Sequence, residues 1–343
     1  MSSITELVRP NIAALEPYST ARDEYDGPIG IFLDANESPY ANGYNRYPDP
    51  HQAELKARIA ALKGIPAGNL FLGNGSDEAI DLVFRIFCVP GKDNVVAIAP
   101  SYGMYGVAAE MNDVEVRPVR LNDDFSLDTE KLLSRCDGRT KLIFLCSPNN
   151  PSANAFPRAQ LLEIIDRFPG VVIVDEAYVD FSSQGSLAQE AVKRDNLIVL
   201  QTLSKARAMA GLRIGQAISS KEIIGLMSMV KYPYNLSRIA MEKALELLQN
   251  PIDVQVKTIV GERARLTAAL TAYPFVRKVF PSDANFLLVR VDDADGLYAY
   301  LLDKQIIVRN RTRIPACENC LRFTVGLPSE NDALLKALDN YKR

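Results

Sequence analysis

The sequence predicts an α/β protein: a large domain with a mostly parallel sheet covered by helices, followed by a smaller α+β domain. Between about residues 69 and 220, short β-rich runs alternate with helical stretches, which is the pattern of a parallel sheet with helices on its faces. Runs such as "VVIV" (171–174) are apolar throughout, which is typical of strands buried on both sides. After about residue 235 a long helical stretch gives way to alternating strands and helices, which indicates the second domain.

The elements of the large domain are expected in a simple order. A strand at 69–72 leads into a helix over 76–87, and Ser76 is expected to be its N-cap. Further β-rich runs lie at 94–100, 141–151, 171–181, 197–205 and 214–220. Because ligands sit at the carboxyl ends of parallel strands, the polar residues that end these runs mark the expected site.

The small domain is expected to follow with a helix over about 252–272. The later elements are a strand, a helix, a strand and a closing helix, at 286–291, 296–305, 320–326 and 330–343. We therefore divide the chain into an N-terminal arm that covers the substrate, a large domain that binds the ligand, and a small domain, over residues 1–45, 46–235 and 236–343.

The composition is that of an ordinary soluble globular protein, with 48% hydrophobic and 24% charged residues. Its 39 Lys and Arg nearly balance 42 Asp and Glu, so the net charge of −3 offers no basic field for nucleic acid or an anionic membrane. No apolar run approaches the roughly 18 residues of a membrane span, and "MSSITELVRP" lacks the apolar core of a signal peptide. A cytoplasmic protein is expected.

Cysteine and histidine are too sparse to predict a metal site. The 5 cysteines are scattered and are expected to be free thiols. Cys317 and Cys320 form a C-x-x-C, but it has neither a second pair nor a nearby histidine. A Ser-His triad or a histidine metal cluster would have to depend on His51 alone, because it is the only histidine.

Lys205 is the first candidate for chemistry. It lies in "TLSKARAMAGLR" (202–213), after an apolar β-prone run and before a stretch of small residues. An ordinary surface lysine is the alternative. A lysine held in an apolar setting, however, has a depressed pKa and can attack a carbonyl as an amine. Ser204 and Arg213 add a hydroxyl and a guanidinium, and a guanidinium suits the oxygens of a phosphate.

Three further clusters lie at expected strand ends. Asp175 directly follows an apolar strand, so its carboxylate needs a cation, either in a structural salt bridge or on the ring nitrogen of a ligand; Tyr178 adds a hydroxyl nearby. Asn150 in "SPNNPS" either belongs to a plain turn or offers an amide to a phenolate or carbonyl oxygen. "GNGSDEAI" (73–80) is either a common capped turn or a helix start whose amides bind phosphate.

Together these residues call for a ligand with an aldehyde, a phosphate and a basic ring nitrogen. Pyridoxal 5′-phosphate carries all three groups. A nicotinamide-dependent dehydrogenase is disfavoured, because no G-x-G-x-x-G opens a helix after a strand.

In the order Asn150, Asp175, Tyr178, Lys205 and Arg213, the chain resembles the fold-type I pyridoxal phosphate aminotransferases. Within them it is similar to the histidinol-phosphate aminotransferases, and the similarity spans nearly the whole chain. The motifs that carry it are "LEPYSTAR", "LDANESPY", "NRYPDP", "SYGMY", "CSPNNP", "VDEAY", "TLSKARAMAGLRIG" and "CLRFTVG". One departure is "NPSAN" (150–154), where these enzymes have N-P-T-G and this chain has Ala153 in place of glycine.

The resemblance implies roles toward the cofactor. Lys205 would bond the aldehyde and then move a proton between two carbons, and Asp175 would pair with the ring nitrogen. Asn150 and Tyr178 would hydrogen-bond the 3′-oxygen, and Tyr102 would stack on the ring. The phosphate would be held by Ser204, Arg213 and backbone amides near Ser76, Asp77 and Glu78.

The resemblance also implies a homodimer with shared sites, because Tyr47 would reach the phosphate from a second subunit. Tyr18, Arg309 and Arg322 would grip the anionic end of the substrate, with Arg311 as the alternative to Arg309. Asn36 lies on the loop expected to cover the substrate.

The implied reaction is transfer of the amino group of L-histidinol phosphate to 2-oxoglutarate, giving imidazole-acetol phosphate and L-glutamate, a step of histidine biosynthesis. An aromatic amino acid aminotransferase or a threonine-phosphate decarboxylase of the same fold is the alternative, since the cofactor motifs do not separate these activities. Tyr18 with two arginines favours a phosphorylated substrate. A pyridoxal-binding regulatory protein is the non-enzymatic alternative, and it is disfavoured because no DNA-binding or basic segment is added.

Overall fold

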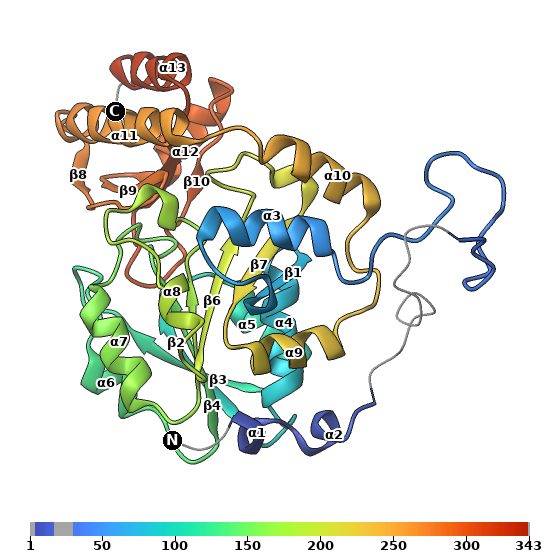
Figure 1. Ribbon diagram of the computed structural model, residues 1–343. Helices are drawn as coiled ribbons and strands as arrows, with labels where there is room; N and C mark the ends of the chain where they lie inside the picture. Colours follow the sequence, from blue (N-terminus) through green and yellow to red (C-terminus); the bar gives the residue numbers. More distant parts are fainter. Residues whose placement is uncertain (1–3, 17–29, 342–343) are drawn as a thin grey trace.

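The computed structural model describes residues 4–16 and 30–341, and its large domain is built on a mixed sheet (Figure 1). The order in this 7-stranded sheet is β1 (Leu70–Asn74), β7 (Ile214–Ile218), β6 (Leu197–Thr202), β5 (Val171–Asp175), β4 (Thr140–Cys146), β2 (Asn94–Ala99) and β3 (Glu115–Arg120). Strands β2 to β6 are parallel, whereas β7 runs antiparallel to both of its neighbours. Each β-rich run predicted for this domain overlaps a strand.

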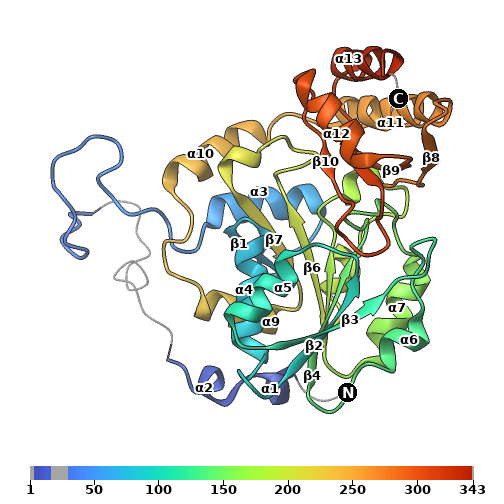
Figure 2. The ribbon, with the colours of Figure 1, turned by 180° about the vertical axis from the view of Figure 1, so that it is seen from behind.

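Helices cover both faces of this sheet (Figures 1 and 2). One face carries α4 (Ser76–Phe87), α5 (Met104–Met111) and α9 (Lys221–Val230), and the other carries α3 (Ala53–Lys63), α6 (Thr129–Leu133), α7 (Arg158–Arg167) and α8 (Ala188–Ala191). Side chains along β4 point alternately to the two faces of the sheet. Phe144 packs with the α4 layer, and Ile143 packs with the α3 layer. The sheet is therefore buried on both sides, as the apolar runs predict.

The small domain has a 4-stranded antiparallel sheet with helices against it. Its strands are β8 (Val276–Val279), β9 (Phe286–Val291), β10 (Arg309–Asn310) and β11 (Cys320–Thr324), and its helices are α11 (Asp253–Thr271), α12 (Ala294–Asp303) and α13 (Pro328–Asp339). The predicted fold class is thus confirmed. The boundary at residue 235 stays a prediction, and the packing of α10 (Arg238–Leu247) against α3 favours a boundary after that helix.

The N-terminal region makes two different kinds of contact. Helices α1 (Ile4–Leu7) and α2 (Pro10–Ala13) pack on the large domain through Ile4 and Ile12, which are buried. Much of the segment 30–46, by contrast, extends away from the rest of the chain in both views (Figures 1 and 2), before Tyr47 packs on Tyr234. None of the helices in the described parts is both long and apolar enough to cross a membrane.

The turn between β1 and α4 differs from the prediction in one respect. Gly75, and not Ser76, is the N-cap of α4, and Ser76 is the first helical residue. Gly75 has a φ of 75°, which glycine adopts without steric cost, and no side chain caps the helix. The prediction that Ser76 caps α4 is therefore wrong, because the tight turn from β1 places the glycine at that position.

A second glycine lets strand β7 approach this turn closely. A Cβ added to Gly215 would lie 2.0 Å from the backbone nitrogen of Ser76 and 2.2 Å from the carbonyl carbon of Gly75. Such distances are far below van der Waals contact, so any side chain at residue 215 would push the start of α4 away from the sheet.

We predict that Gly215→Ala destabilises the protein by about 1–3 kcal/mol, the usual cost of overpacking. Gly225→Ala is the matched control, because a Cβ there has nothing within 4 Å and the residue lies within α9; it should stabilise by about 0.5–1 kcal/mol. Urea unfolding of both variants measures this difference. Equal stability of Gly215→Ala and the unchanged protein would contradict the close approach.

Candidate active site

A cavity opens at the carboxyl ends of β4, β5 and β6, beside the start of α4. Among the residues that line it are Ser76, Asp77, Tyr102, Asn150, Asp175, Tyr178, Ser204, Lys205 and Arg213. All of them were singled out from the sequence. They come from strand ends that are far apart in the chain, which is how a parallel sheet brings polar residues together at one edge.

Asp175, the last residue of β5, is 3% exposed. One of its carboxylate oxygens accepts a hydrogen bond from the Tyr105 hydroxyl at 2.7 Å, and the other accepts one from the Ala177 backbone N–H at 3.1 Å. Burial raises the pKa of Asp175, and these two hydrogen bonds oppose that effect. Within the described residues no lysine or arginine forms an ion pair with it, so a structural salt bridge does not account for its burial.

Lys205 lies across the cavity from this carboxylate. Two effects lower the pKa of Lys205: desolvation is the larger, and repulsion from the nearby Arg322 guanidinium is the smaller. The negative charge of Asp175 opposes both. The lowered pKa and its largest cause, desolvation, agree with the expected setting. Ala206 is buried, but Ala208, Ala210 and Gly211 are exposed, so these last three small residues do not enclose the amine. The amine instead lies 5.5 Å from the centre of the Tyr178 ring.

One end of the cavity is suited to an anion. The α4 helix begins there, and its first backbone amides have no side-chain cap. Arg213 reaches the same turn, with a guanidinium nitrogen 3.8 Å from an Asp77 carboxylate oxygen, and Tyr102 donates to the other Asp77 oxygen at 3.1 Å. The Ser204 backbone N–H donates to the Thr202 hydroxyl, which fixes the loop leading to Lys205.

The small domain contacts Asn150, a residue that lines the cavity, through Arg322 on β11. Its guanidinium donates to the Asn150 side-chain oxygen at 2.6 Å and lies 5.1 Å from the centre of the Phe286 ring. Since arginine has no acceptor, this bond fixes the Asn150 amide with its NH₂ group free to donate elsewhere. Phe286 also packs edge-on against Tyr178 at 5.1 Å, so the two domains meet beside the site.

Arg309 and Arg311 both lie near Arg322. Arg309 is exposed and is the direct partner of Arg322 in the β10–β11 ladder, so their side chains project from the same face. Arg311 is half-buried, and desolvation, followed by repulsion from Arg322 and Arg309, lowers its pKa to about 10. Its buried Nε has no hydrogen-bond partner in the described residues. Three guanidinium groups therefore lie close together on this edge of the small domain.

Other predicted site residues do not line the cavity. The Glu78 carboxylate turns back to accept hydrogen bonds from the Asn74 backbone and the Asn235 amide. Tyr47 stacks on Tyr234 with ring centres 4.5 Å apart. Asn36 is exposed on the extended segment, at a φ of 54°. Tyr18 lies outside the described residues.

Ala153, in the turn after Asn150, has a left-handed backbone conformation. Ala153 is fully buried at a φ of 72°, a conformation in which an L-residue other than glycine is strained. Its backbone N–H donates to the Asn149 carbonyl, and its own carbonyl accepts from the Asp283 N–H, both at 2.8 Å. Hydrogen bonds on both sides thus hold the alanine where the related enzymes have glycine.

Tyr105, Cys146 and Thr202 are site residues that the sequence did not indicate. Cys146 and Thr202 line the cavity, and the buried Tyr105 supports Asp175 from behind. Tyr105 belongs to the "SYGMY" motif, but no spacing rule separates its role from that of Tyr102. Only the pairing of α5 with the end of β5 reveals it.

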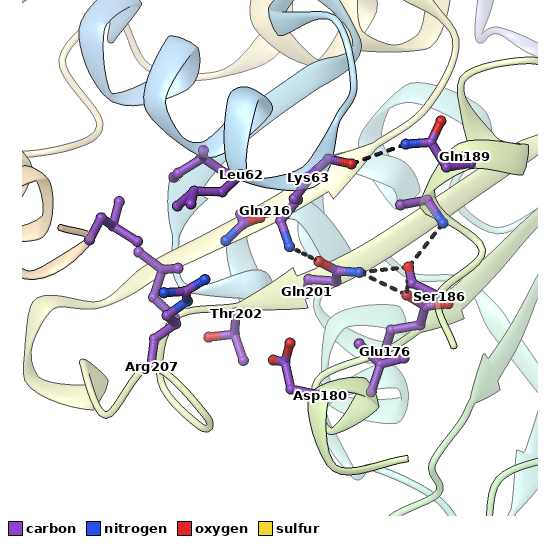
Figure 3. A pocket seen from close by; sticks show the side chains of 15 residues that line it. Leu62, Lys63, Glu176, Asp180, Ser186, Gln189, Gln201, Thr202, Arg207 and Gln216 are labelled. Carbon is purple, nitrogen blue, oxygen red and sulfur yellow. Dashed lines mark hydrogen bonds between the residues drawn. The ribbon is translucent and has the colours of Figure 1, made fainter. Parts of the chain in front are cut away.

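A second cavity lies beneath α3 (Figure 3). Glu176, the residue after Asp175, is 3% exposed there and accepts hydrogen bonds from the Ser186 hydroxyl at 2.5 Å, the Leu187 N–H at 2.7 Å and the Gln201 amide at 2.8 Å. Lys63 donates to the oxygen of the same Gln201 amide. Three protein donors therefore satisfy the Glu176 carboxylate, whereas within the described part of the chain Asp175 accepts from two.

Comparison with known proteins relates this site to one family. The family described as aminotransferase class I and II matches residues 31–338. A histidinol-phosphate aminotransferase from Parabacteroides distasonis is 54% identical, covering 100% of both chains. The crystal structure of the histidinol-phosphate aminotransferase from Clostridium acetobutylicum is 26% identical with a TM-score of 0.79, covering 85% of this chain and 89% of that one.

A further solved structure shares the fold. It is the histidinol-phosphate aminotransferase from Sinorhizobium meliloti in complex with pyridoxal-5′-phosphate, at 23% identity and a TM-score of 0.78, covering 85% of this chain and 82% of that one. The family match covers most of the chain, and the 54% identity extends from end to end. The chain belongs to the class I and II aminotransferases and, within them, to the histidinol-phosphate aminotransferase family.

Proposed function

We propose that this protein transfers the amino group of L-histidinol phosphate to 2-oxoglutarate, giving imidazole-acetol phosphate and L-glutamate, as a step of histidine biosynthesis. The observation that carries the proposal is the full-length identity of 54% to a histidinol-phosphate aminotransferase. The cavity supports it, because it combines a lysine of lowered pKa, a buried unpaired carboxylate and an anion-binding helix start.

The cavity fits pyridoxal 5′-phosphate, the cofactor of this family. Asp175 is a buried carboxylate with no ion-pair partner among the described residues, so a protonated ring nitrogen offsets its desolvation. Gly75 leaves room beside the uncapped amides of α4, since a Cβ there would lie 2.7 Å from an Arg213 guanidinium nitrogen. When bound, the cofactor withdraws electrons from the substrate carbon that gives up its proton.

The chain's own residues then have distinct tasks. Lys205, whose amine is neutral at a lower pH than an ordinary lysine, would condense with the aldehyde with loss of water, and would later carry the proton from the substrate carbon to the former aldehyde carbon. The NH₂ group of Asn150, turned away from Arg322, would donate to the ring oxygen together with the Tyr178 hydroxyl. Tyr102 would stack on the ring, and Ser204 and Arg213 would hold the phosphate with the amides of Ser76, Asp77 and Glu78.

Two chemically different anions must bind at the substrate end. Histidinol phosphate carries a phosphate, whereas glutamate carries carboxylates, and a guanidinium fork accepts either in bidentate geometry. We assign this role to Arg322 and its ladder partner Arg309. Tyr18, which lies outside the described residues, would donate a further hydrogen bond to the phosphate, and the loop with Asn36 would cover the substrate.

We further propose a homodimer with shared sites. Much of the segment 30–46 extends from its own chain, and Ile31, Leu33 and Tyr40 are exposed by 91%, 90% and 83% (Figure 1). Apolar side chains gathered on such a segment are typical of a contact with another subunit. Tyr47 directly follows this segment and does not line the cavity of its own subunit, so we assign it to the phosphate of the cofactor in the partner subunit.

The free thiols of all 5 cysteines support a reducing compartment, the cytoplasm.

The substrate is tested with a panel of amino donors and 2-oxoglutarate. We predict that L-histidinol phosphate exceeds L-phenylalanine in kcat/KM by roughly a hundredfold, because charge-assisted bonds to a phosphate are worth about 1.5–3 kcal/mol each. Lys205→Ala is the control and should abolish glutamate formation. A preference for phenylalanine, or release of CO₂ from O-phospho-L-threonine without glutamate formation, would contradict the proposed substrate.

The dual-anion role is tested with arginine-to-lysine changes. Arg322→Lys should lower kcat/KM about tenfold or more in both half-reactions, because one ammonium cannot replace a bidentate fork and charge-assisted bonds are strong. Arg309→Lys should act in the same direction. Arg313→Lys, an exposed arginine on the same segment, is the control and should have no effect. Unchanged glutamate turnover in Arg322→Lys would show that it does not bind both anions.

Shared sites are tested by mixing two inactive variants. Lys205→Ala and Tyr47→Ala homodimers should regain activity after subunit exchange, because each mixed dimer has one site with both residues intact. Random exchange leaves about a quarter of all sites intact in a two-fold dimer. Native mass spectrometry verifies that subunits have exchanged. The control is the Lys205→Ala variant alone, taken through the same exchange procedure, and it should stay inactive. Absence of any gain after full exchange would place Tyr47 in its own subunit's site.

A further inference from the structure

We propose that Tyr105 is a positioning residue that holds the Asp175 carboxylate ionised and oriented against the cofactor's ring nitrogen. The proposal rests on the proposed function, because it assumes that pyridoxal 5′-phosphate occupies the cavity. Tyr105 would not contact the cofactor's ring nitrogen. It would act only through its hydrogen bond to Asp175.

The position of Tyr105 is firmly fixed. It lies on α5 and is 2% exposed, and its ring stacks on Phe144 of β4 with centres 4.8 Å apart. The Tyr102 ring meets it edge-on at 5.7 Å. Packing on two sides leaves the hydroxyl pointing at one Asp175 oxygen, to which it donates at 2.7 Å. An ordered ring of this kind loses little entropy in making the bond.

The two donors to Asp175 also fix the plane of the carboxylate. Tyr105 holds one oxygen and the Ala177 N–H holds the other, so the carboxylate cannot rotate about its Cβ–Cγ bond without losing a hydrogen bond. A hydrogen bond to the charged form of a carboxyl group favours that form. With Tyr105 in place, Asp175 is therefore a weaker base, and the proton shared with the ring nitrogen stays on the ring.

Other groups face Asp175, and they set the background for any pH test. They are Asp77 of α4, Cys146 of β4, Tyr102, Tyr178 and Lys205. Burial raises the pKa of the Tyr105, Tyr102 and Cys146 groups, so these remain protonated through the neutral range. When the cofactor is bound to Lys205, protonation of the lysine nitrogen changes the visible absorbance. The pH midpoint of that change is therefore the quantity to measure.

The test is Tyr105→Phe, reconstituted with pyridoxal 5′-phosphate and titrated without substrate by visible absorbance. Loss of the hydroxyl makes Asp175 a stronger base and leaves less positive charge on the ring. The Lys205 nitrogen should then hold its proton to higher pH, with a midpoint raised by about one unit, and kcat should fall about tenfold at unchanged KM. Tyr273→Phe is the matched control, because its hydroxyl also donates to a carboxylate, Asp339, at 2.7 Å.

Two further variants separate positioning from a structural role. In an Asp175→Asn background, Tyr105→Phe should change kcat less than about twofold, because the charge through which Tyr105 acts is gone. A tyrosine fluorinated on the ring at residue 105 keeps the fold but is a stronger donor, so it should shift the midpoint downward. That protein decides the question even where Tyr105→Phe fails to fold.

Three results would overturn the role of Tyr105: an unchanged midpoint in Tyr105→Phe, losses that add fully in the double variant, or a midpoint shift in Tyr273→Phe of the same size. Because the titration needs only bound cofactor, it reports on Tyr105 even where histidinol phosphate proves not to be the substrate. Failure to bind pyridoxal 5′-phosphate at all would instead refute the proposed function and this inference with it.

Discussion

Asp175 is buried at the end of β5 with no cation paired to it among the described residues, and this is the constraint on which the rest of the site depends. Desolvation raises its pKa above the ordinary value of 3.8. A carboxyl group with a raised pKa in the folded state makes the protein less stable as pH rises from the unfolded value through the folded one. At neutral pH the chain alone therefore bears an electrostatic cost, and a ligand with a protonated ring nitrogen removes it.

The neighbouring carboxylate shows why Asp175 is the one suited to a ligand. Asp175 and Glu176 are consecutive, and each is 3% exposed. Glu176 faces the cavity beneath α3, where donors from Ser186, Leu187 and Gln201 satisfy it (Figure 3). Asp175 has two donors and an open side toward Lys205. The two carboxylates face opposite cavities, so one serves the structure and the other remains available for chemistry.

The sequence predicts the strand ends and the residue types of the site, but not every contact between them. Continuous apolar runs located the buried strands, whereas β3 escaped notice because "EVRPVR" is charged and contains a proline, as an edge strand can. Ser76 was mistaken for the cap, since a side-chain rule overlooks a glycine at positive φ. Tyr105 could not be found at all, because its contact with Asp175 spans 70 residues and depends on how α5 packs.

Asn150 connects the cavity of the large domain to Arg322, the residue of the small domain that we propose binds the anion. Its oxygen is committed to Arg322, a group that only donates, so its NH₂ group is the part left for the cofactor. A bound anion would compete with the Asn150 oxygen for the Arg322 guanidinium. It would therefore weaken the hydrogen bond that orients the Asn150 amide. Phe286 of β9 packs on both Arg322 and Tyr178. One side chain therefore supports Tyr178, which we propose contacts the ring oxygen, and Arg322, which we propose contacts the substrate. Under the proposed roles, one anion would replace another at Arg322 in the small domain, while Asp175 keeps its place at the end of β5 in the large one.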